Sequence, residues 1–352
     1  MVVIAGGIPA RKVVGNLEYS EYATHRKGFK LDFSMGENFL SPTLNLESRV
    51  NGYGFTQDPK LIKIIASKLE VKPENILITA GCDFALHHIA ETFLEPKDVV
   101  LIPNPTFPRY YYHSKLYSAK IHQVYFEKFP YEFDLGIIKK RVTELKPKIT
   151  FLCNPNNPTG HYLPINEIEN FVRMSKGSLI AIDEALADYT GESASRLVNN
   201  HSNLLIARSF SKLYGLAGLR IGYVVGHKKC IKEISKLISP FEVSTNSIDA
   251  AKQVLGDEDF TRKSIEALST GMKYLKDHCS IRYTDSKANI ILLDAGDKSP
   301  NLYQTLIDNE VLTIDGKSFY GLGRNNCIRV CVKDMGSMRQ LVSIINQQII
   351  SN

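Results

Sequence analysis

The sequence predicts an α/β protein with a mostly parallel central sheet, followed by a smaller α+β domain. From about residue 58 to residue 240, short apolar runs alternate with amphipathic helical segments. This alternation is typical of a parallel sheet covered by helices on both faces. After residue 240 the pattern changes to a long helix, three short strands and a final helix. We therefore predict an N-terminal arm over 1–30, a large domain over 31–240 and a small C-terminal domain over 241–352.

Helices are predicted where apolar residues recur on one helical face. Residues 58–69 form such a face with Leu61, Ile65 and Leu69, and Pro59 suits the first turn. The other expected helices span 83–94, 134–145, 165–174, 228–237, 260–278 and 335–349.

Strands are predicted as short apolar runs between these helices. They are expected at 76–79, 99–102, 121–126, 148–153, 179–183, 204–208, 221–225, 290–293, 311–314 and 327–332. Ligands of parallel sheets bind beyond the carboxyl ends of the strands, so functional residues should directly follow the strands.

Composition excludes several classes of protein. With 43% hydrophobic and 23% charged residues, the 352-residue chain has enough apolar content to fold, unlike a disordered chain. No apolar run reaches the roughly 18–20 residues that span a bilayer, and the N-terminus does not resemble a secretory signal. The net charge, 43 − 37 = +6, is too dispersed for a nucleic-acid binder but fits an anionic ligand. We expect a cytoplasmic protein with no nucleic-acid or membrane partner.

Cysteine and histidine spacing favours neither disulfides nor a metal. The six cysteines include no C-x-x-C pair, and a chain of this size without an export signal does not need a disulfide framework. His87 and His88 with Glu91 do not form H-E-x-x-H, and adjacent histidines point to different helix faces. We expect no metal site.

The segment Ser209–Tyr223, S-F-S-K-L-Y-G-L-A-G-L-R-I-G-Y, is the most informative in the chain. Lys212 directly follows a predicted strand and lies beside Ser209 and Ser211, and Arg220 is eight residues further on. The glycines of the segment allow the backbone to approach a ligand closely. A buried lysine with hydroxyl groups and a guanidinium nearby suits a Schiff base beside a phosphate.

With this segment the chain resembles the fold-type I, pyridoxal-phosphate (PLP) dependent aminotransferases of classes I and II. It is most similar to the branch of histidinol-phosphate aminotransferase and threonine-phosphate decarboxylase, over about residues 31–340. The resemblance implies the PLP-transferase fold, pyridoxal 5'-phosphate as cofactor and a Schiff base on Lys212.

Two further segments match the family in order. In Asn154–Gly160, N-P-N-N-P-T-G, the resemblance assigns Asn157 to the phenolic oxygen of the cofactor; by itself the segment would equally be a surface turn. In Leu179–Leu186, L-I-A-I-D-E-A-L, it assigns Asp183 to the pyridine nitrogen. A buried anion keeps that nitrogen protonated and the ring electron-withdrawing.

The resemblance also implies a phosphate site and a stacking ring. Thr79–Asp83, T-A-G-C-D, opens a predicted helix whose free N–H groups favour an anion. The phosphate ligands implied here are Gly81, Cys82, Asp83, Ser209, Ser211 and Arg220. Phe107, in P-N-P-T-F-P, would stack on the pyridine, although an isolated phenylalanine is as often a core residue.

Substrate and subunit contacts are implied at both ends of the chain. Tyr53, in N-G-Y-G-F-T-Q-D, would reach the phosphate of the neighbouring subunit, which requires a homodimer. Arg329, in N-C-I-R-V, would clamp the substrate α-carboxylate with its planar fork. Arg324 is a second candidate for an anion, and Asn38 is the third expected substrate-binding residue.

The chain departs from the family at two places. Leu186 stands where the family has a tyrosine that binds the phenolic oxygen. Gly36–Phe39, G-E-N-F, replaces the N-E-N-P segment, and the preceding L-D-F-S is closer to the decarboxylase branch. These departures leave the substrate open.

The predicted function is ping-pong transfer of an amino group to a keto acid. The amine would be an amino acid or an amino-acid-derived, including phosphorylated, compound, and Lys212 would move the Cα proton. One alternative is a PLP-dependent decarboxylase of an amino acid or its phosphate. The other is a non-catalytic PLP-fold or nucleotide-binding protein, although Gly215–Gly222 is not G-x-G-x-x-G. Neither donor nor acceptor is identified.

Overall fold

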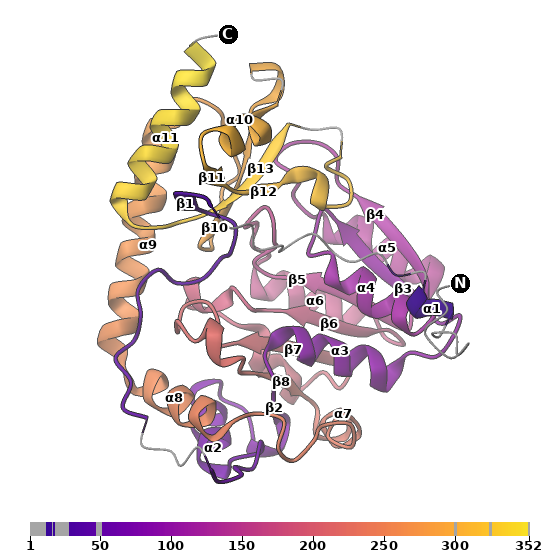
Figure 1. Cartoon of the computed structure of the whole chain (residues 1–352). Helices are drawn as coiled ribbons and strands as arrows, with labels where there is room; N and C mark the ends of the chain where they lie inside the picture. The colour runs from indigo at the N-terminus through magenta and orange to yellow at the C-terminus, as the bar shows by residue number, and fades with distance from the viewer. Residues whose placement is uncertain are drawn as a thin grey trace, which may run out of the picture.

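A computed structural model describes residues 12–15, 17, 28–46, 51–298, 301–323 and 326–350. The large sheet lies across the middle of the molecule, and the C-terminal strands lie above it in the upper part (Figure 1). The long helix α9 (Glu258–His278) runs along one side from the lower helices to the upper domain. Most of the predicted arm lies outside the described residues; within it, the structure describes α1 (Lys12–Gly15).

Among the described residues, seven strands form the central sheet, in the order β2-β8-β7-β6-β5-β3-β4. Their bounds are β2 Ile76–Thr79, β3 Val99–Asn104, β4 Lys120–Tyr125, β5 Ile149–Cys153, β6 Leu179–Asp183, β7 Leu204–Ser209 and β8 Gly222–Gly226. Only β8 runs antiparallel to its neighbours. The predicted α/β class with a mostly parallel sheet is therefore confirmed.

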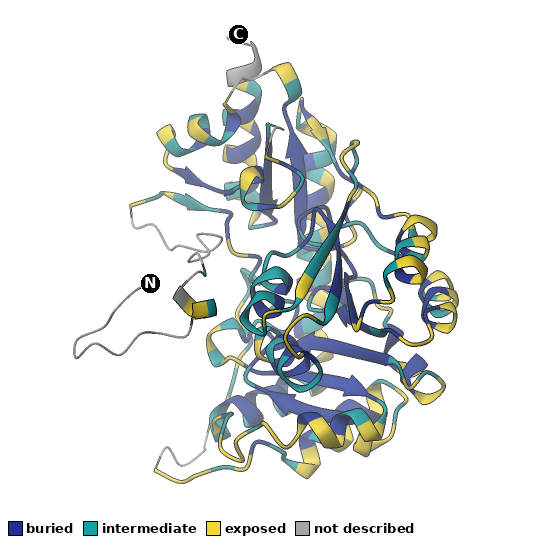
Figure 2. Ribbon diagram, turned by 90° about the vertical axis from the view of Figure 1, so that its right-hand side faces the viewer, coloured by how far each residue is buried: buried dark blue, intermediate teal, exposed yellow. Residues whose placement is uncertain are grey.

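Helices cover both faces of this sheet, and its central strands are buried throughout (Figure 2). One face packs against α2 (Pro59–Lys68), α5 (Leu135–Leu145), α6 (Ile165–Met174) and α8 (Thr245–Gly256). The other packs against α3 (Cys82–Phe93), α4 (Arg109–Leu116) and α7 (Lys228–Ile234). Burial on both faces explains why these strands are continuous apolar runs rather than alternating ones.

The C-terminal unit has its own core around an antiparallel sheet, ordered β12-β13-β10-β9. Its strands are β9 Arg282–Tyr283, β10 Ile290–Asp294, β12 Ile314–Asp315 and β13 Cys327–Cys331. Helices α9, α10 (Leu302–Asp308) and α11 (Met335–Ile350) accompany it. A parallel pair, β1 (Leu31–Asp32) with β11 (Val311–Leu312), joins the start of the described chain to this unit.

Packing shifts both predicted domain boundaries. Phe33 is buried in the C-terminal core, so residues 31–34 pack with the small unit rather than with the large one. Ile248 and Val254 of α8 are buried in the large core, although we expected the small domain to begin at residue 241. Residues 31–34 therefore belong with the C-terminal core although they precede the large unit in the chain, whereas α8 extends the large unit beyond residue 240.

Helices α1, α4, α8 and α10 were not predicted. Helix α4, R-Y-Y-Y-H-S-K-L, has no amphipathic pattern, and it forms because Tyr110 is buried against the sheet. Helix α8 begins with Ser244, whose side chain accepts a hydrogen bond from the Ser247 N–H. The strand expected at 311–314 is divided into β11 and β12, which pair with different strands.

No helix in the described ranges combines the length and the apolar character needed to cross a membrane.

Gly222 sets the position of helix α3 against the sheet. A Cβ at this residue would lie 2.5 Å from the Arg208 carbonyl oxygen and 2.8 Å from the Cys82 nitrogen. Both neighbours are backbone atoms and cannot rotate away. The start of α3 can therefore approach β8 only if residue 222 is a glycine.

We predict that Gly222→Ala lowers the free energy of unfolding by about 1–3 kcal/mol, the usual range for overpacking. Urea denaturation of the purified protein measures the change. Gly218→Ala is the matched control, because a Cβ there meets no atom within 4 Å and should cost less than about 0.5 kcal/mol. Equal stability of the two variants would contradict this account of the close approach.

Candidate active site

Lys212 follows β7 and extends into the space between the two units. Its Nζ atom lies 3.5 Å from the position that a Cβ on Gly36 would occupy, beside Ile290 and Asn289 of the C-terminal unit. Although part of the side chain is accessible, burial of the amine, reinforced by the nearby Arg329 cation, lowers its pKa to about 8. A substantial fraction of this amine is therefore neutral close to physiological pH, as a nucleophile or base requires.

Asp183, the last residue of β6, is buried and accepts three hydrogen bonds. Oδ1 accepts from the Cys82 thiol (3.3 Å) and from the Ala185 N–H (2.9 Å), while Oδ2 accepts from the Tyr110 hydroxyl (2.8 Å). No ion pair within the described part of the chain includes Asp183. Burial raises the pKa of Asp183, and the three donors oppose that rise. A carboxylate in this state is suited to pair with a cationic ligand group.

The N-terminus of α3 meets the lysine-bearing loop at a site suited to an anion. Gly81 has φ +91°, a backbone conformation that favours glycine, and a Cβ on it would lie 2.9 Å from Arg220 Nη2, at the mobile end of that side chain. Arg220 Nη1 donates to Ser211 Oγ at 3.3 Å, and the Ser211 N–H donates to Ser209 Oγ at 3.0 Å. The first-turn N–H groups of a helix have no partner within the helix, and here a guanidinium and two hydroxyls lie beside them.

The side chain of Asp83 is occupied by hydrogen bonds to other protein residues. It accepts from Arg109 through both oxygens (3.0 and 2.8 Å) and from His113 at 2.9 Å. Burial favours the neutral acid, but these hydrogen bonds outweigh burial and hold the pKa of Asp83 well below its usual range. Any contact of Asp83 with the predicted phosphate would therefore come from its backbone N–H.

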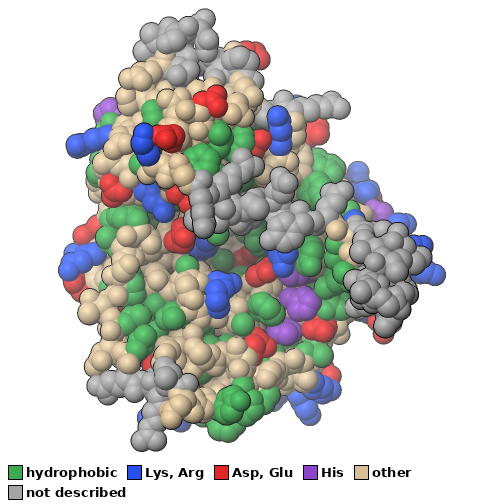
Figure 3. Space-filling view, in the orientation of Figure 1, with side chains coloured by type: hydrophobic (Ala, Val, Ile, Leu, Met, Phe, Trp, Pro, Cys, Tyr) green, Lys and Arg blue, Asp and Glu red, His purple; other side chains and the backbone are tan. Residues whose placement is uncertain are grey.

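Histidine side chains gather on one face of the molecule (Figure 3). His87 lies against His88 and His113, with ring centroids 5.6 and 5.4 Å apart. His88 contacts Glu91 and Glu242, which outweigh burial and raise its pKa. Across the described ranges, no three His, Cys, Asp or Glu side chains converge in a way that could hold a metal ion.

Arg329 connects the small unit to the large one. It lies on β13, is 3% exposed, and donates to the Ser34 carbonyl oxygen and to Asn157 Oδ1 (3.4 Å). The turn that carries Asn157 also docks on the small unit: Thr284 donates to the Thr159 carbonyl oxygen at 2.6 Å. The predicted phenolic-oxygen ligand and the predicted carboxylate clamp are therefore neighbours.

The remaining predicted site residues are Phe107, Tyr53, Asn38 and Arg324. Phe107 is partly buried with its ring edge-on to Tyr110 (5.7 Å), whereas Tyr53 is 88% exposed and contacts Phe241 (4.9 Å). Asn38 donates to the Leu213 carbonyl oxygen and to Ser264 Oγ, both at 2.8 Å, so its amide group holds the loop after Lys212. Arg324 lies outside the described residues.

Leu186, which replaces the tyrosine of the family, is buried in the core of the small unit.

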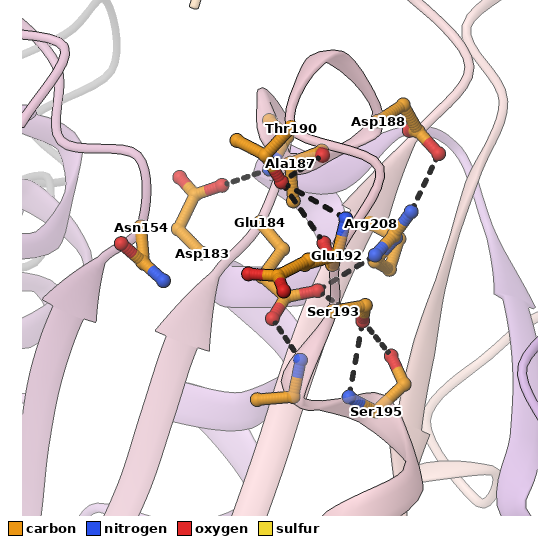
Figure 4. Close-up of polar contacts among 12 residues, drawn as sticks. Asn154, Asp183, Glu184, Ala187, Asp188, Thr190, Glu192, Ser193, Ser195 and Arg208 are labelled. Atoms are coloured by element: carbon orange, nitrogen blue, oxygen red, sulfur yellow. Dashed lines mark hydrogen bonds and ion pairs between the residues drawn. The ribbon is translucent and has the colours of Figure 1, made fainter. Parts of the chain in front are cut away.

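A buried ion-pair network holds the segment that follows β6 (Figure 4). Arg208 donates to Glu184 at 2.7 Å and to Asp188 at 2.6 Å, and Glu184 also accepts from the Ala194 N–H at 2.8 Å. The network fixes the strand ends next to Asp183 and Lys212.

Sequence reasoning missed Tyr110 and the Glu184–Arg208 pair. The available signal for Tyr110 was its position one helical turn after Phe107. For the Glu184–Arg208 pair, the available signal was that both residues lie near the ends of the strands that precede the predicted site residues. Neither signal is specific without the topology that makes β6 and β7 neighbours.

Comparison with known proteins agrees with this geometry. Residues 26–345 match the family described as "Aminotransferase class I and II". The chain is 32% identical over 289 residues to a protein named histidinol-phosphate aminotransferase from Moorella thermoacetica, covering 80% of this chain and 72% of that protein. The chain belongs to the class I and II aminotransferases.

Two solved structures share the fold. One is histidinol-phosphate aminotransferase from Sinorhizobium meliloti in complex with pyridoxal-5'-phosphate, with a TM-score of 0.86, 21% identity and 97% coverage of each chain. The other is L-threonine-O-3-phosphate decarboxylase from Porphyromonas gingivalis, with a TM-score of 0.72, 22% identity, and coverage of 92% of this chain and 100% of that one. The protein is thus a PLP-dependent aminotransferase of an amino acid or amino-acid derivative, as the sequence predicted.

The residues present fit PLP. Gly81 and Gly222 leave space where a Cβ would meet Arg220 or the start of α3, as a phosphate cradle requires. Asp183 offers a buried anion without a cationic partner among the described residues, and Lys212 offers an amine with a lowered pKa. These features match the phosphate, the ring nitrogen and the aldehyde of the cofactor.

We predict that PLP binds covalently to the apoprotein at a rate that rises with pH, with a midpoint near about 8, because the neutral Lys212 amine is the reactive form. Arg329→Ala removes a cation that lowers this pKa, so the midpoint should move to higher pH. Stopped-flow absorbance of the bound cofactor gives the profile. Arg329→Lys keeps the charge and should retain a midpoint closer to that of the native protein, and identical profiles for all three proteins would show that Arg329 does not influence the amine.

Proposed function

We propose that the amino donor is histidinol phosphate or a closely related phosphorylated amine, and that the acceptor is a 2-keto acid. Curated relatives at about 30% identity carry the name histidinol-phosphate aminotransferase. The observation that carries the proposal is the position of Arg329, whose charge acts on the Lys212 amine while its guanidinium lies beside Asn157. An anionic group held by Arg329 would be next to the reacting amine.

Each site residue then has a chemical role. Arg329 binds and orients the anionic group of the substrate, because a planar guanidinium grips carboxylate or phosphate oxygens in a fixed direction. Lys212 would take the Cα proton and return it, across the amine nitrogen, to the aldehyde-derived carbon of PLP, since its amine stays within reach and its pKa is lowered to about 8. Bound PLP supplies a protonated ring that withdraws electrons from the substrate Cα.

The remaining contacts with PLP are assigned to the other predicted site residues. Asp183 holds the ring nitrogen, Asn157 the phenolic oxygen and Phe107 the ring face. The phosphate is bound by the start of α3, at Gly81, Cys82 and Asp83, together with Ser209, Ser211 and Arg220. With Leu186 in place of the family tyrosine, Asn157 holds the phenolic oxygen without a hydroxyl partner from that position.

We further propose a homodimer in which Tyr53 completes the site of the neighbouring subunit. Tyr53 and Phe55 are 88% and 69% exposed, and both rings contact Phe241, which is 48% exposed. Clustered, highly exposed aromatic side chains are typical of an interface with another chain.

The cytoplasmic location also stays a proposal. It is supported by the six free cysteines, since a reducing compartment keeps thiols unpaired.

The substrate proposal is tested with purified holoenzyme supplied with histidinol phosphate, histidine, aspartate or O-phosphothreonine, each with and without 2-oxoglutarate. We expect turnover of histidinol phosphate that depends on the keto acid and releases no carbon dioxide. Carbon dioxide release from O-phosphothreonine without a keto acid would instead identify a decarboxylase. Lys212→Ala should lower turnover about a hundredfold or more and abolish the visible absorbance of bound PLP, whereas the exposed Lys273→Ala should change neither.

The composite site is tested by mixing two defective subunits. Tyr53→Ala should weaken PLP binding about tenfold, the value of one hydrogen bond to a charged group. In a mixed dimer with Lys212→Ala, one site combines the native Lys212 with the native Tyr53 of the other subunit. Co-expressed, differently tagged variants should therefore regain up to one native site per dimer. PLP binding at that site no tighter than in the Tyr53→Ala homodimer would contradict Tyr53 exchange.

A further inference from the structure

Two side chains around Asp183 have no role in the scheme above. The Cys82 thiol and the Tyr110 hydroxyl come from different helices, α3 and α4, and donate to opposite oxygens of the carboxylate, Oδ1 and Oδ2. With the Ala185 N–H on Oδ1, they give Asp183 three neutral donors. Each is almost fully enclosed: Tyr110 is 0% and Cys82 8% exposed.

We propose that Cys82 and Tyr110 are positioning residues that keep Asp183 ionised and oriented, so that it receives the protonated pyridine nitrogen of PLP as its missing cation. This inference rests on the proposed role of Asp183. Both donors stay protonated at neutral pH, because burial and the Asp183 charge raise the pKa of the thiol and of the hydroxyl.

The geometry holds both donors in place. The Tyr110 ring stacks on Phe151, with centroids 5.2 Å apart and planes within 3°, and meets Phe107 edge-on. The hydroxyl cannot swing away without disrupting this buried stack. Cys82 is the first residue of α3, fixed by the close approach of Gly222 to its backbone nitrogen.

The surrounding charges make these donors necessary. Asp83 is a second carboxylate near Asp183, and its charge disfavours ionisation of Asp183. The Cys153 thiol also faces the carboxylate but donates to the Pro155 carbonyl oxygen. Lys212 contributes only a distant attraction. Hydrogen bonds from Cys82, Tyr110 and Ala185 are thus the main stabilisation of the buried anion.

The consequence for the cofactor concerns the position of one proton between the ring nitrogen and Asp183. Donors to the carboxylate stabilise its charged form and therefore favour the proton on nitrogen. Removing a donor makes the carboxylate more basic and moves the proton toward oxygen. The ring then becomes a weaker electron sink even though every direct cofactor contact remains.

The test titrates Asp183 in the apoprotein by infrared difference spectroscopy, with Asp183→Asn assigning the carboxyl band. We expect the titration midpoint to rise by about one pH unit in Tyr110→Phe, the size of one hydrogen bond to a charged group. Cys82→Ala should raise it by less, because a thiol is a weak donor. Cys82→Ser should leave it at or below the native midpoint. Cys230→Ala is the control, because the Cys230 thiol donates to the Ser202 carbonyl oxygen instead, and it should leave the midpoint unchanged.

In the holoenzyme, the chemical shift of ¹⁵N-labelled PLP reports protonation of the ring nitrogen. The protonated fraction should fall in Tyr110→Phe and be retained in Cys82→Ser. Unchanged Asp183 titration in both Tyr110→Phe and Cys82→Ala would overturn the inference. If Tyr110→Phe fails to fold, the Cys82→Ala and Cys82→Ser pair decides it. Failure of the native protein to bind PLP would instead refute the cofactor site itself, so the two failures are distinguishable.

Discussion

The buried carboxylate of Asp183 is the constraint on which the site depends. An ionised group at the end of a buried strand is costly unless it is hydrogen-bonded or paired. Here neutral donors reach it from α3, α4 and its own loop, and among the described residues no protein cation pairs with it. The fold therefore maintains an anion that a cationic ring nitrogen can complete.

Lys212 lies in the loop after the neighbouring strand β7, and its surroundings favour the neutral form of its amine. β6 and β7 are parallel neighbours, so their carboxyl ends bring Asp183 and the Lys212 loop to one edge of the sheet. Burial and Arg329 destabilise the ammonium form and make the amine available. Burial raises the pKa of Asp183 while its hydrogen bonds favour the charged form, whereas burial and Arg329 together favour the neutral form of Lys212.

The division into two units is itself part of the site. Arg329 comes from the small unit, yet it contacts Asn157 of the large unit. Asn38 ties the segment after β1 to the loop of Lys212, and Thr284 holds the turn that carries Asn157. Any movement between the units would therefore shift Arg329 and Asn157, the proposed substrate clamp and the proposed cofactor ligand, together.

The sequence by itself determined the fold class, the bounds of most strands and the identity of the cofactor. β2 and β6 coincide with the predicted residues, because a continuous apolar run between turn residues has few alternatives. The S-x-S-K segment after a strand suited a Schiff base beside a phosphate, and the family resemblance that it carries implied PLP. Only the tertiary structure decided that residues 31–34 pack in the C-terminal core, that α8 belongs to the large core, and that Tyr110 and Cys82 meet at Asp183. These contacts join residues far apart in the chain, and their energies depend on burial and direction, which no local pattern encodes.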